Sequence, residues 1–300
     1  MSYLPLKLNP ITDTSVFLAN EVQSKNYKIF YYDPKNLSVI NSKVIASGFF
    51  IKFNYKNKKF FKILKKQKLD LLKCKFILIR QDPPFNLEYI SATYILDTIK
   101  NKVKILNNPT SIRNISEKLY SVKYQKYMPN TIFTQNITEI KKFFKVNKKV
   151  ILKPIHSYSG NDIHLLNKFD AKLINKFIKK HDHIMCQRFL PKISKGDKRV
   201  FIINGKVCGA ISRVPKKGSF LSNMSKGAKP INIKLTKTEN KISKIIAKDL
   251  KNENIFFAGI DFIDQKLNGD INVTSPTGLK SLFDLSGINL AKTFWKELRA

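Results

Sequence analysis

The stretch that most constrains the fold and the chemistry of this chain runs from Phe257-Ala-Gly-Ile-Asp261 to Asp270-Ile-Asn-Val-Thr-Ser-Pro-Thr277. The apolar run 256–263 predicts a β-strand, and Asn268-Gly269 is a turn signal before a second strand. Two residues on that second strand, Asp270 and Asn272, share a face and lie roughly 7 Å apart. The sequence therefore predicts a β-hairpin that ends in a small, hydroxylated loop.

The register of this hairpin decides whether its oxygen-bearing side chains converge. A hairpin centred near residues 266–267 places Asp261 opposite Asn272, with Asp270 beside them. A two-residue turn at Asn268-Gly269 would shift that register. Two carboxylates and an amide suit Mg²⁺ that also holds nucleotide phosphates. The alternative interpretation is an acidic hairpin that is simply solvated.

The overall composition sets the class of protein. A chain of 300 residues that is 43% hydrophobic can bury a large core, in one large or two to three smaller domains. No window approaches about 18 uncharged apolar residues, so we expect no membrane partner. The first residues do not form a basic and then apolar signal segment, which argues against secretion. Three widely spaced cysteines indicate thiols in a reducing cytoplasm.

The formal charge of +35 would attract polyanions. Its lysines, however, run through the whole chain with abundant Asn, Ile, Phe and Tyr, which is typical of a coding bias. The densest patch, residues 54–66, interleaves aromatic residues with lysines as a single-strand binder does, and is equally consistent with a helix that buries an apolar stripe. No RNA-recognition, zinc-finger or helix-turn-helix signature is present, so we do not expect nucleic acid as a partner.

The order of predicted elements divides the chain in two. Strand-like segments at 27–32, 76–80 and 103–106, with a helix at 87–99, favour a small parallel α/β domain. A turn signal at 107–110 precedes a helix that carries Arg113, Glu117 and Lys118. The remainder is richer in hairpins. We therefore expect an α/β domain over residues 1–114 and an α+β domain over residues 115–300.

Several polar residues stand where strands end. Arg80-Gln-Asp-Pro-Pro-Phe85 follows a strand and leads to a helix, a common ligand position in open α/β sheets, although Pro-Pro also stiffens a purely structural turn. Lys153 closes an apolar strand, which indicates a phosphate partner or a snorkelling side chain. The apolar strand Cys186-Gln-Arg-Phe-Leu-Pro191 offers exposed backbone and Gln187 to an adenine.

Two arginines lie on the strands joined by Asn204-Gly205. If that dipeptide is a plain two-residue turn, strand alternation puts Arg199 and Arg213 on opposite faces of the hairpin. A bulge or a longer turn is needed to aim both at one site. Cys208, in the same hairpin, has apolar neighbours, so we expect it to pack in a core rather than to act as a nucleophile.

Taken in chain order, these motifs resemble those of the bacterial glutathione synthetases of the ATP-grasp superfamily. The resemblance extends from about residue 9 to 290 and rests on Arg-x-Asp-Pro-Pro-Phe85, Arg113 with Glu117-Lys118-Leu119, Ile-Leu-Lys153-Pro154, Gly196-Asp-Lys-Arg199, Arg213-Val-Pro, Gly-x-Asp261 and Asn272-Val-Thr-Ser-Pro-Thr277. It implies a mixed α/β and α+β fold, with an N-terminal Rossmann-like pre-ATP-grasp domain followed by an ATP-grasp domain with a hairpin-rich lid.

The resemblance also implies an activity. A family member is a cytoplasmic, ATP- and Mg²⁺-dependent ligase, with Mn²⁺ as an alternative metal. It joins γ-glutamylcysteine to glycine through an acyl phosphate, giving glutathione, ADP and phosphate, and its bacterial relatives assemble as homo-oligomers. Two alternatives stay open: an ATP-grasp paralogue with a different substrate pair or weak activity, and a basic nucleic-acid-binding protein that keeps the fold as a scaffold.

Roles for individual residues follow from the resemblance alone. Groups that would hold the nucleotide are Lys118, Lys153, Gly160, Gln187, Phe189 and Leu190. Those that would bind the metal are Asp261, Asp270 and Asn272. The catalytic cations that would neutralise the transferred phosphoryl group and the acyl phosphate are Arg199 and Arg213. Side chains that would face the peptide substrate are Arg80, Asn272, Ser275 and Thr277.

Two positions depart from the family pattern. The phosphate loop, glycine-rich in the family, reads His156-Ser-Tyr-Ser-Gly160 here, and Gly160 is its only glycine. Asp270 stands where the family usually has glutamate, so its carboxylate lies one methylene further from the metal. A bridging water can absorb a shift of that size, or metal binding can weaken.

Overall fold

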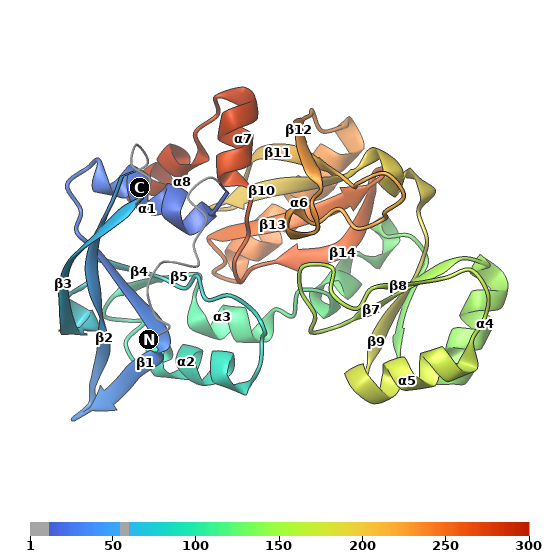
Figure 1. Cartoon of the computed structure of the whole chain (residues 1–300), viewed down its shortest axis with the longest axis horizontal. Coiled ribbons are helices and arrows are strands. Elements are labelled where there is room, and N and C mark those ends of the chain that lie inside the picture. The colour runs from blue at the N-terminus through green and yellow to red at the C-terminus, as the bar shows by residue number, and fades with distance from the viewer. Residues whose placement is uncertain (1–11, 55–59, 300) are drawn as a thin grey trace.

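The structure is a computed structural model that describes residues 12–54 and 60–299. Strands within those residues form a three-stranded, a two-stranded, a five-stranded and a four-stranded sheet. The molecule is elongated, with the three-stranded sheet at one end, the five-stranded sheet in the middle and the four-stranded sheet at the other end (Figure 1). In the described part of the chain no helix is both long and apolar enough to cross a membrane.

The N-terminal part combines an antiparallel meander with one parallel pair. After α1 (Thr14–Gln23), the strands β1 (Ile29–Ile40), β2 (Lys43–Phe53) and β3 (Phe61–Asp70) pair antiparallel in that order. Then β4 (Phe76–Leu78) and β5 (Lys104–Leu106) pair in parallel across α2 (Leu87–Asp97). The parallel unit expected from the sequence is thus confined to β4-α2-β5. The segment 27–32 belongs instead to the meander, because a tight turn at residues 41–42 folds β2 back onto β1.

The lysine-rich patch at 54–66 is not a helix where the structure describes it. Residues 55–59 lie outside the described part, and from Phe61 onward the chain is the strand β3, paired with β2 over its whole length. Ile63 and Leu64 are exposed, at 37% and 57% of their surface. The expectation of a helical apolar stripe is therefore wrong, because pairing with β2 satisfies the backbone groups of this segment.

The segment that joins the two halves is broken rather than continuous. The helix α3 (Pro109–Asn114) ends before Ile115, whose backbone is no longer helical. Lys118 then precedes a 3-10 helix over Leu119–Tyr127. The sequence placed Arg113 and Lys118 on one helix, and that expectation is wrong. The break lets the Glu117 carbonyl accept a hydrogen bond from the Ile271 amide, which ties this segment to the central sheet.

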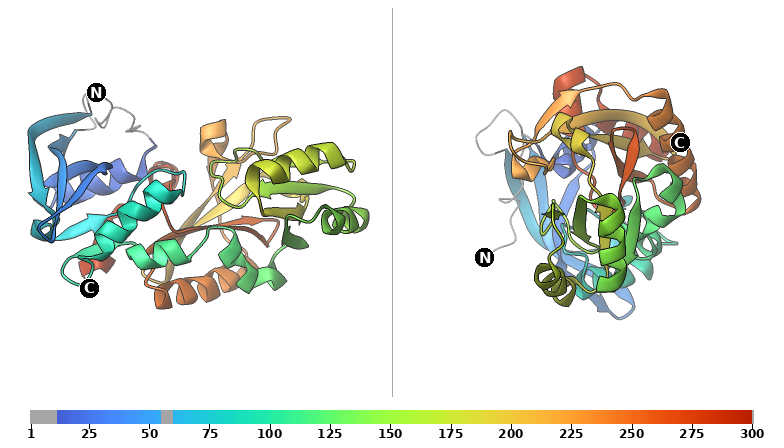
Figure 2. Two further views of the ribbon diagram at one scale, coloured as in Figure 1. Left: turned by 90° about the horizontal axis from the view of Figure 1, so that it is seen from below. Right: turned by 90° about the vertical axis from the view of Figure 1, so that its right-hand side faces the viewer.

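The four-stranded sheet carries a helical layer on one face. Its antiparallel strands lie in the order β6 (Thr131–Thr134), β9 (Ile184–Arg188), β7 (Val150–Pro154) and β8 (His164–Leu166). The helices α4 (Ile137–Asn147) and α5 (Ala171–His181) lie beside this sheet (Figure 2). Val150 and Leu152 pack into the core beneath the helices. Strand alternation therefore turns Lys153 to the opposite face, toward the centre of the molecule.

The five-stranded sheet is covered on both faces. Its antiparallel strands follow the order β12 (Lys229–Asn232), β11 (Lys206–Val214), β10 (Asp197–Ile203), β13 (Phe257–Ile263) and β14 (Lys266–Asn272). On one face α6 (Lys237–Asn252) packs against Val200 and Ile202. On the other, α1, α7 (Leu279–Ser286) and α8 (Leu290–Arg299) pack against Phe201 and Ile203. Arg199 shares this second face, beyond the reach of the apolar cluster.

Short 3-10 helices cover Leu71–Lys73, Pro191–Lys195 and Met224–Lys226.

The apolar cluster on the second face of the five-stranded sheet joins the two ends of the chain. It contains Leu18 from α1 as well as Phe294 and Trp295 from α8, and the Trp295 indole N–H donates to the Leu18 carbonyl at 2.8 Å. The C-terminal helices thereby hold the N-terminal segment against the central sheet.

Candidate nucleotide and metal site

The hairpin β13–β14 turns earlier than the sequence indicated. Asp264 and Gln265, both with positive φ, form the turn, and Ile263 pairs with Lys266. The expected turn at Asn268-Gly269 and the expected centre at 266–267 are both wrong. Asn268-Gly269 lies instead in an irregular stretch of β14, where the three residues 268–270 lie opposite the single residue Asp261.

This irregularity changes which residues of β13 and β14 lie opposite each other. Beyond it, Asn272 pairs with Gly259, not with Asp261 as expected. Gly259 is two residues before Asp261, so Asn272 still lies on the Asp261 face of the hairpin. Asp270 lies in the irregular stretch of the same hairpin, opposite Asp261. Asp261 and Asp270 both line the charged cavity described below, whereas Asn272 is not among the residues of its wall.

A bulge brings the two arginines together. Asn204-Gly205 is a two-residue turn, but Phe201 pairs with Gly209 while Ile202 pairs with Val207, which leaves Cys208 as an extra residue. Beyond the bulge Arg213 lies opposite Asp197, so Arg199 and Arg213 share one face. The bulge that the sequence required is present. Cys208 is the residue of the bulge that has no partner on β10. It is half-buried and contacts the apolar cluster on the second face of the five-stranded sheet.

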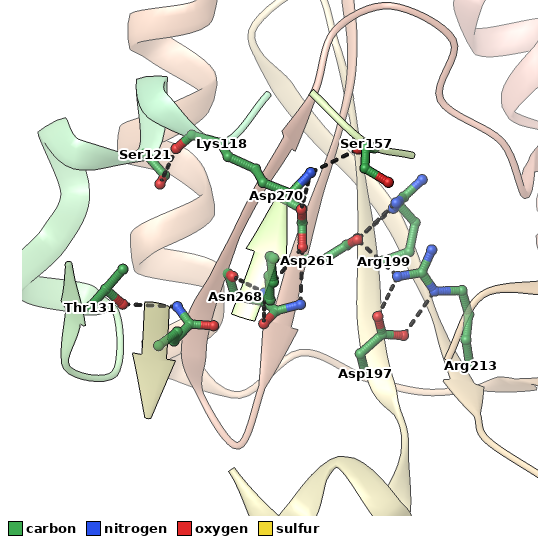
Figure 3. Close-up of polar contacts among 12 residues, drawn as sticks. Lys118, Ser121, Thr131, Ser157, Asp197, Arg199, Arg213, Asp261, Asn268 and Asp270 are labelled. Atoms are coloured by element: carbon green, nitrogen blue, oxygen red, sulfur yellow. Dashed lines mark hydrogen bonds and ion pairs between the residues drawn. The ribbon is translucent and has the colours of Figure 1, made fainter. Parts of the chain in front are cut away.

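A buried charge network occupies that face (Figure 3). Arg199 donates to both oxygens of Asp261, and its Nη2–Oδ2 distance is 2.8 Å. Arg213 donates to Asp197 and, at 2.8 Å, to Asp261. Burial disfavours the Asp261 charge, yet the two guanidinium groups outweigh it and lower the pKa of Asp261 to about 2. Asp261 is therefore an anion held by two cations.

Two lysines bracket the second carboxylate. The ammonium groups of Lys118 and Lys153 each lie 3.6 Å from an oxygen of Asp270. Lys118 also donates to the Ser157 carbonyl, and Lys153 to the side chain and carbonyl of Asn268, all at 2.9 Å (Figure 3). Burial lowers the pKa of Lys153, and the neighbouring Asp270 opposes that shift. These ammonium groups are desolvated and poised for an anion.

The charged groups line one cavity between the two larger sheets. Its wall includes Lys118, Lys153, Arg199, Arg213, Asp261 and Asp270. An apolar end is formed by Ile151, Gln187, Phe189, Leu190, Ile193 and Ile263. A loop wall includes Ser157 to Asn161, and Gly160 there lies so close to Asn223 that a Cβ would approach its Oδ1 to 2.4 Å. Nearby, Lys226 donates to Asn161 at 2.8 Å, so two loops meet over this cavity.

A buried hydrogen bond to Thr131 orients the Gln187 side chain. The Gln187 amide donates to the Thr131 hydroxyl at 2.9 Å, and that hydroxyl donates to the Pro129 carbonyl at 2.7 Å. All of this is buried. Thr131→Val keeps the shape but leaves the Gln187 amide without its acceptor, so we expect a loss of about 1–3 kcal/mol in unfolding free energy.

Chemical denaturation of Thr131→Val beside Thr138→Val measures this effect. Thr138 is exposed on α4, and its replacement should change stability by no more than about 0.5 kcal/mol. Equal stability changes in the two variants would show that the Thr131–Gln187 hydrogen bond contributes nothing.

Three of the residues expected at the peptide, Asn272, Ser275 and Thr277, lie at the end of β14 or just after it, and none of them is in the wall of the charged cavity. Asn272 accepts hydrogen bonds from Ser275 and Thr274, which shapes the loop after β14. The Ser275 hydroxyl donates to the Gln81 carbonyl at 2.9 Å, and Arg80 donates to the Pro276 carbonyl at 3.0 Å. Thr277 is exposed. The loop is thus fastened to the segment that follows β4, and Arg80 lies at that junction.

The donor set fits a divalent cation that shares its shell with a nucleotide. Within residues 12–54 and 60–299, no three His, Cys, Asp or Glu side chains gather as a complete metal cage. Asp261 and Asp270 offer carboxylate oxygens, and both line the charged cavity. Mg²⁺ is commonly held by one or two carboxylates together with substrate phosphates, which matches this arrangement.

Sequence reasoning missed four residues around the cavity. Asp197 pairs with Arg213, Asn268 with Lys153, and Thr131 with Gln187. The fourth, Glu117, lines the cavity, and burial raises the pKa of its carboxyl group while Lys118 opposes that shift. Asp197 and Glu117 had a signal, because Asp197 lies two residues before Arg199 and Glu117 directly precedes Lys118. Asn268 and Thr131 meet their partners through contacts between distant segments.

Comparison with known proteins places these observations in a family. The model of the prokaryotic glutathione synthetase ATP-grasp domain matches residues 117–287, and that of the prokaryotic glutathione synthetase N-terminal domain matches residues 5–113. A glutathione synthetase of Rhodopseudomonas palustris is 32% identical over 98% of this chain and 95% of its own length. One from Buchnera aphidicola is 35% identical over 95% of this chain and 90% of its own.

Solved structures support the same fold at low sequence identity. The macrocyclase MdnC, bound with precursor peptide MdnA from Microcystis aeruginosa, superposes with a TM-score of 0.65 at 13% identity, covering 98% of this chain and 97% of its own. The D-alanine–D-alanine ligase of Bacillus anthracis, complexed with ATP, gives 0.54 at 13% identity over 77% and 81% of the two chains. The expected mixed α/β and ATP-grasp fold is confirmed, and the chain belongs to the prokaryotic glutathione synthetase family.

Proposed function

We propose that this protein is an ATP-dependent carboxylate–amine ligase that joins γ-glutamylcysteine to glycine, giving glutathione, ADP and phosphate. The observation that supports this most is a cavity in which Lys118 and Lys153 bracket Asp270, while Arg199 and Arg213 both bind Asp261. Such a cavity suits a metal-bound polyphosphate and a developing acyl phosphate. Family membership supplies the substrate pair.

The nucleotide roles proposed here follow from position in the cavity. Lys118 and Lys153 would hold the α- and β-phosphates beneath the loop that contains Gly160. The apolar end, with Gln187, Phe189 and Leu190, would hold the adenine. Asp261, Asp270 and Asn272 would hold a divalent cation, which would neutralise the charge of the phosphates. We propose Mg²⁺, with Mn²⁺ able to replace it because both accept hard oxygen ligands.

The chemistry then needs positioning and charge neutralisation rather than a protein nucleophile. A cysteinyl carboxylate oxygen attacks the γ-phosphorus of ATP, and ADP leaves with the bond electrons. The neutral amine of glycine attacks the acyl carbon, the tetrahedral intermediate expels phosphate, and the amine proton is released. Arg199 and Arg213 would neutralise the transferred phosphoryl group. Arg80, Asn272, Ser275 and Thr277 would hold the peptide.

The arrangement of the chain supports two smaller proposals. We place the domain boundary between residues 114 and 115, where α3 ends and the segment that contacts the central sheet begins. We place the protein in the cytoplasm, because Cys74, Cys186 and Cys208 are free thiols, which suits a reducing compartment.

The test of the proposed function is release of ADP. We expect ADP when Mg-ATP, γ-glutamylcysteine and glycine are all present, and a marked loss of turnover when either amino-acid substrate is omitted. Turnover with other acceptors but not with glycine would assign a different substrate pair. An absence of nucleotide binding at millimolar Mg-ATP, together with salt-sensitive RNA binding, would instead support the nucleic-acid alternative.

A further inference from the structure

Two hydrogen-bond donors beside the substrate loop are buried without partners in the described part of the chain. Arg80 uses Nε for the Ser15 hydroxyl at 3.1 Å and Nη2 for the Pro276 carbonyl at 3.0 Å, which leaves Nη1 unpaired. Tyr89 is fully buried, and its hydroxyl is also unpaired. Leaving such donors buried and unpaired is costly, so each requires an acceptor, which a ligand or a water molecule can supply.

The two donors belong to one electrostatic cluster. Arg80 and Tyr89 interact with each other and with Asp82, and Arg80 also interacts with Asp13. Asp82 is exposed and has no hydrogen bond or ion pair to any described residue. Asp13 caps α1 through the Val16 amide. The cluster thus holds two carboxylates and one guanidinium within a chain of net charge +35.

The cluster adjoins the route to the nucleotide. Tyr89 lines a small cavity with Phe85, Ser157 and Thr274, and Glu117 lines both this cavity and the charged one. Tyr89 is the member of the cluster that lines the small cavity, so a ligand bound at the Tyr89 hydroxyl can extend through it toward the charged cavity. The anchoring of Arg80 to Ser15 and Pro276 fixes the guanidinium, so its free Nη1 is pre-organised.

We propose that Arg80, Asp82 and Tyr89 bind the free amino-acid head of the γ-glutamyl residue. This inference rests on the proposed function and deepens it. A γ-linkage leaves an α-carboxylate and an α-ammonium on the glutamyl carbon. Arg80 Nη1 and the Tyr89 hydroxyl donate to the carboxylate, and Asp82, supported by the field of Asp13, accepts from the ammonium. An α-linked dipeptide lacks this arrangement and is rejected.

A cycle of variants and substrate analogues tests each half of the head. Glutarylcysteine lacks the α-ammonium, and 4-aminobutyrylcysteine lacks the α-carboxylate. Tyr89→Phe should lower kcat/KM about tenfold for substrates that carry the carboxylate and leave 4-aminobutyrylcysteine unchanged. Asp82→Asn should lower kcat/KM about fivefold for substrates that carry the ammonium, a modest loss because an exposed ion pair is weak. The same variant should leave kcat/KM for glutarylcysteine unchanged.

Matched controls separate binding from structure. Tyr94 is exposed on the same helix as Tyr89, and Asp33 is a carboxylate on β1. Neither Tyr94→Phe nor Asp33→Asn should change kcat/KM for one of the three substrates more than for the others. Tyr89→Phe removes only an unpartnered hydroxyl, so its melting temperature should not fall. Losses that are equal for all three substrates would overturn the inference.

The same cycle, read as calorimetric affinity for each dipeptide, does not depend on turnover. If the unsubstituted protein binds γ-glutamylcysteine but makes no ADP with glycine, the proposed reaction fails while the head site stands. If turnover is normal and the variants do not discriminate between the analogues, the head site fails while the proposed reaction stands. Failure of the unsubstituted protein to bind γ-glutamylcysteine at all would reject both.

Discussion

Replacing Asp261 with alanine should lower the free energy of unfolding by about 3–5 kcal/mol and abolish ADP formation. Asp261 is buried and is the one carboxylate that both Arg199 and Arg213 contact in the described part of the chain. Its removal leaves the buried Arg199 side chain with no anionic partner there. Arg213 keeps Asp197, so the cost arises mainly at Arg199. The two arginines would also lose the group that aims them at one point.

The matched control for this variant is Asp264→Asn, three residues away in the turn of the same hairpin, because asparagine tolerates the positive φ of this position. Asp264 is exposed and pairs with Lys192, itself largely in solvent. Its loss should cost no more than about 1 kcal/mol. Urea denaturation followed by circular dichroism measures both variants. Equal and small costs for the two would show that the buried network does not hold Arg199 in place.

Replacing Asp270 with alanine should lower kcat/KM for ATP by about 100-fold or more, because a metal ligand that neutralises phosphate charge contributes several kcal/mol. The loss of fold stability should be smaller than for Asp261→Ala. Lys118 and Lys153 keep their hydrogen bonds to the carbonyls of Ser157 and Asn268, so neither ammonium is stranded. Loss of Asp270 should therefore affect mainly catalysis, whereas loss of Asp261 should affect both catalysis and stability.

Steady-state ADP release over a range of Mg²⁺ concentrations checks this second prediction. Asp284→Ala is the control, since Asp284 is an exposed carboxylate on α7 that pairs only with Lys280 among the described residues. The Asp270 variant should need more Mg²⁺ for half-maximal rate, whereas the control should not. An unchanged Mg²⁺ requirement would remove Asp270 from the proposed metal site.

Most of the strands that carry the cavity could be predicted from local patterns. The apolar run before Lys153 and the apolar run through Asp261 both read as buried strands, and both are. The rule of two-residue alternation then correctly indicated that Arg199 and Arg213 need a bulge to share a face. Local sequence correctly indicated the turn at Asn204-Gly205 but failed at the turn of the β13–β14 hairpin. Asn268-Gly269 has the composition of a hairpin turn, yet it serves as an irregularity, because Asp264-Gln265 can also adopt positive φ.

The sequence by itself determined which residue types are present and in what order: lysines at strand ends, an Asp-x-Asn pair, and two arginines on one hairpin. Tertiary structure alone decided which of them meet. Asp270 reaches Lys118 and Lys153, and Gln187 reaches Thr131, across separations that no local pattern encodes. Packing buries the Tyr89 hydroxyl and Arg80 Nη1, and neither atom has a hydrogen-bond partner among the described residues. Burial, register and long-range pairing are properties of the folded chain, and they turn a list of charged residues into a cavity.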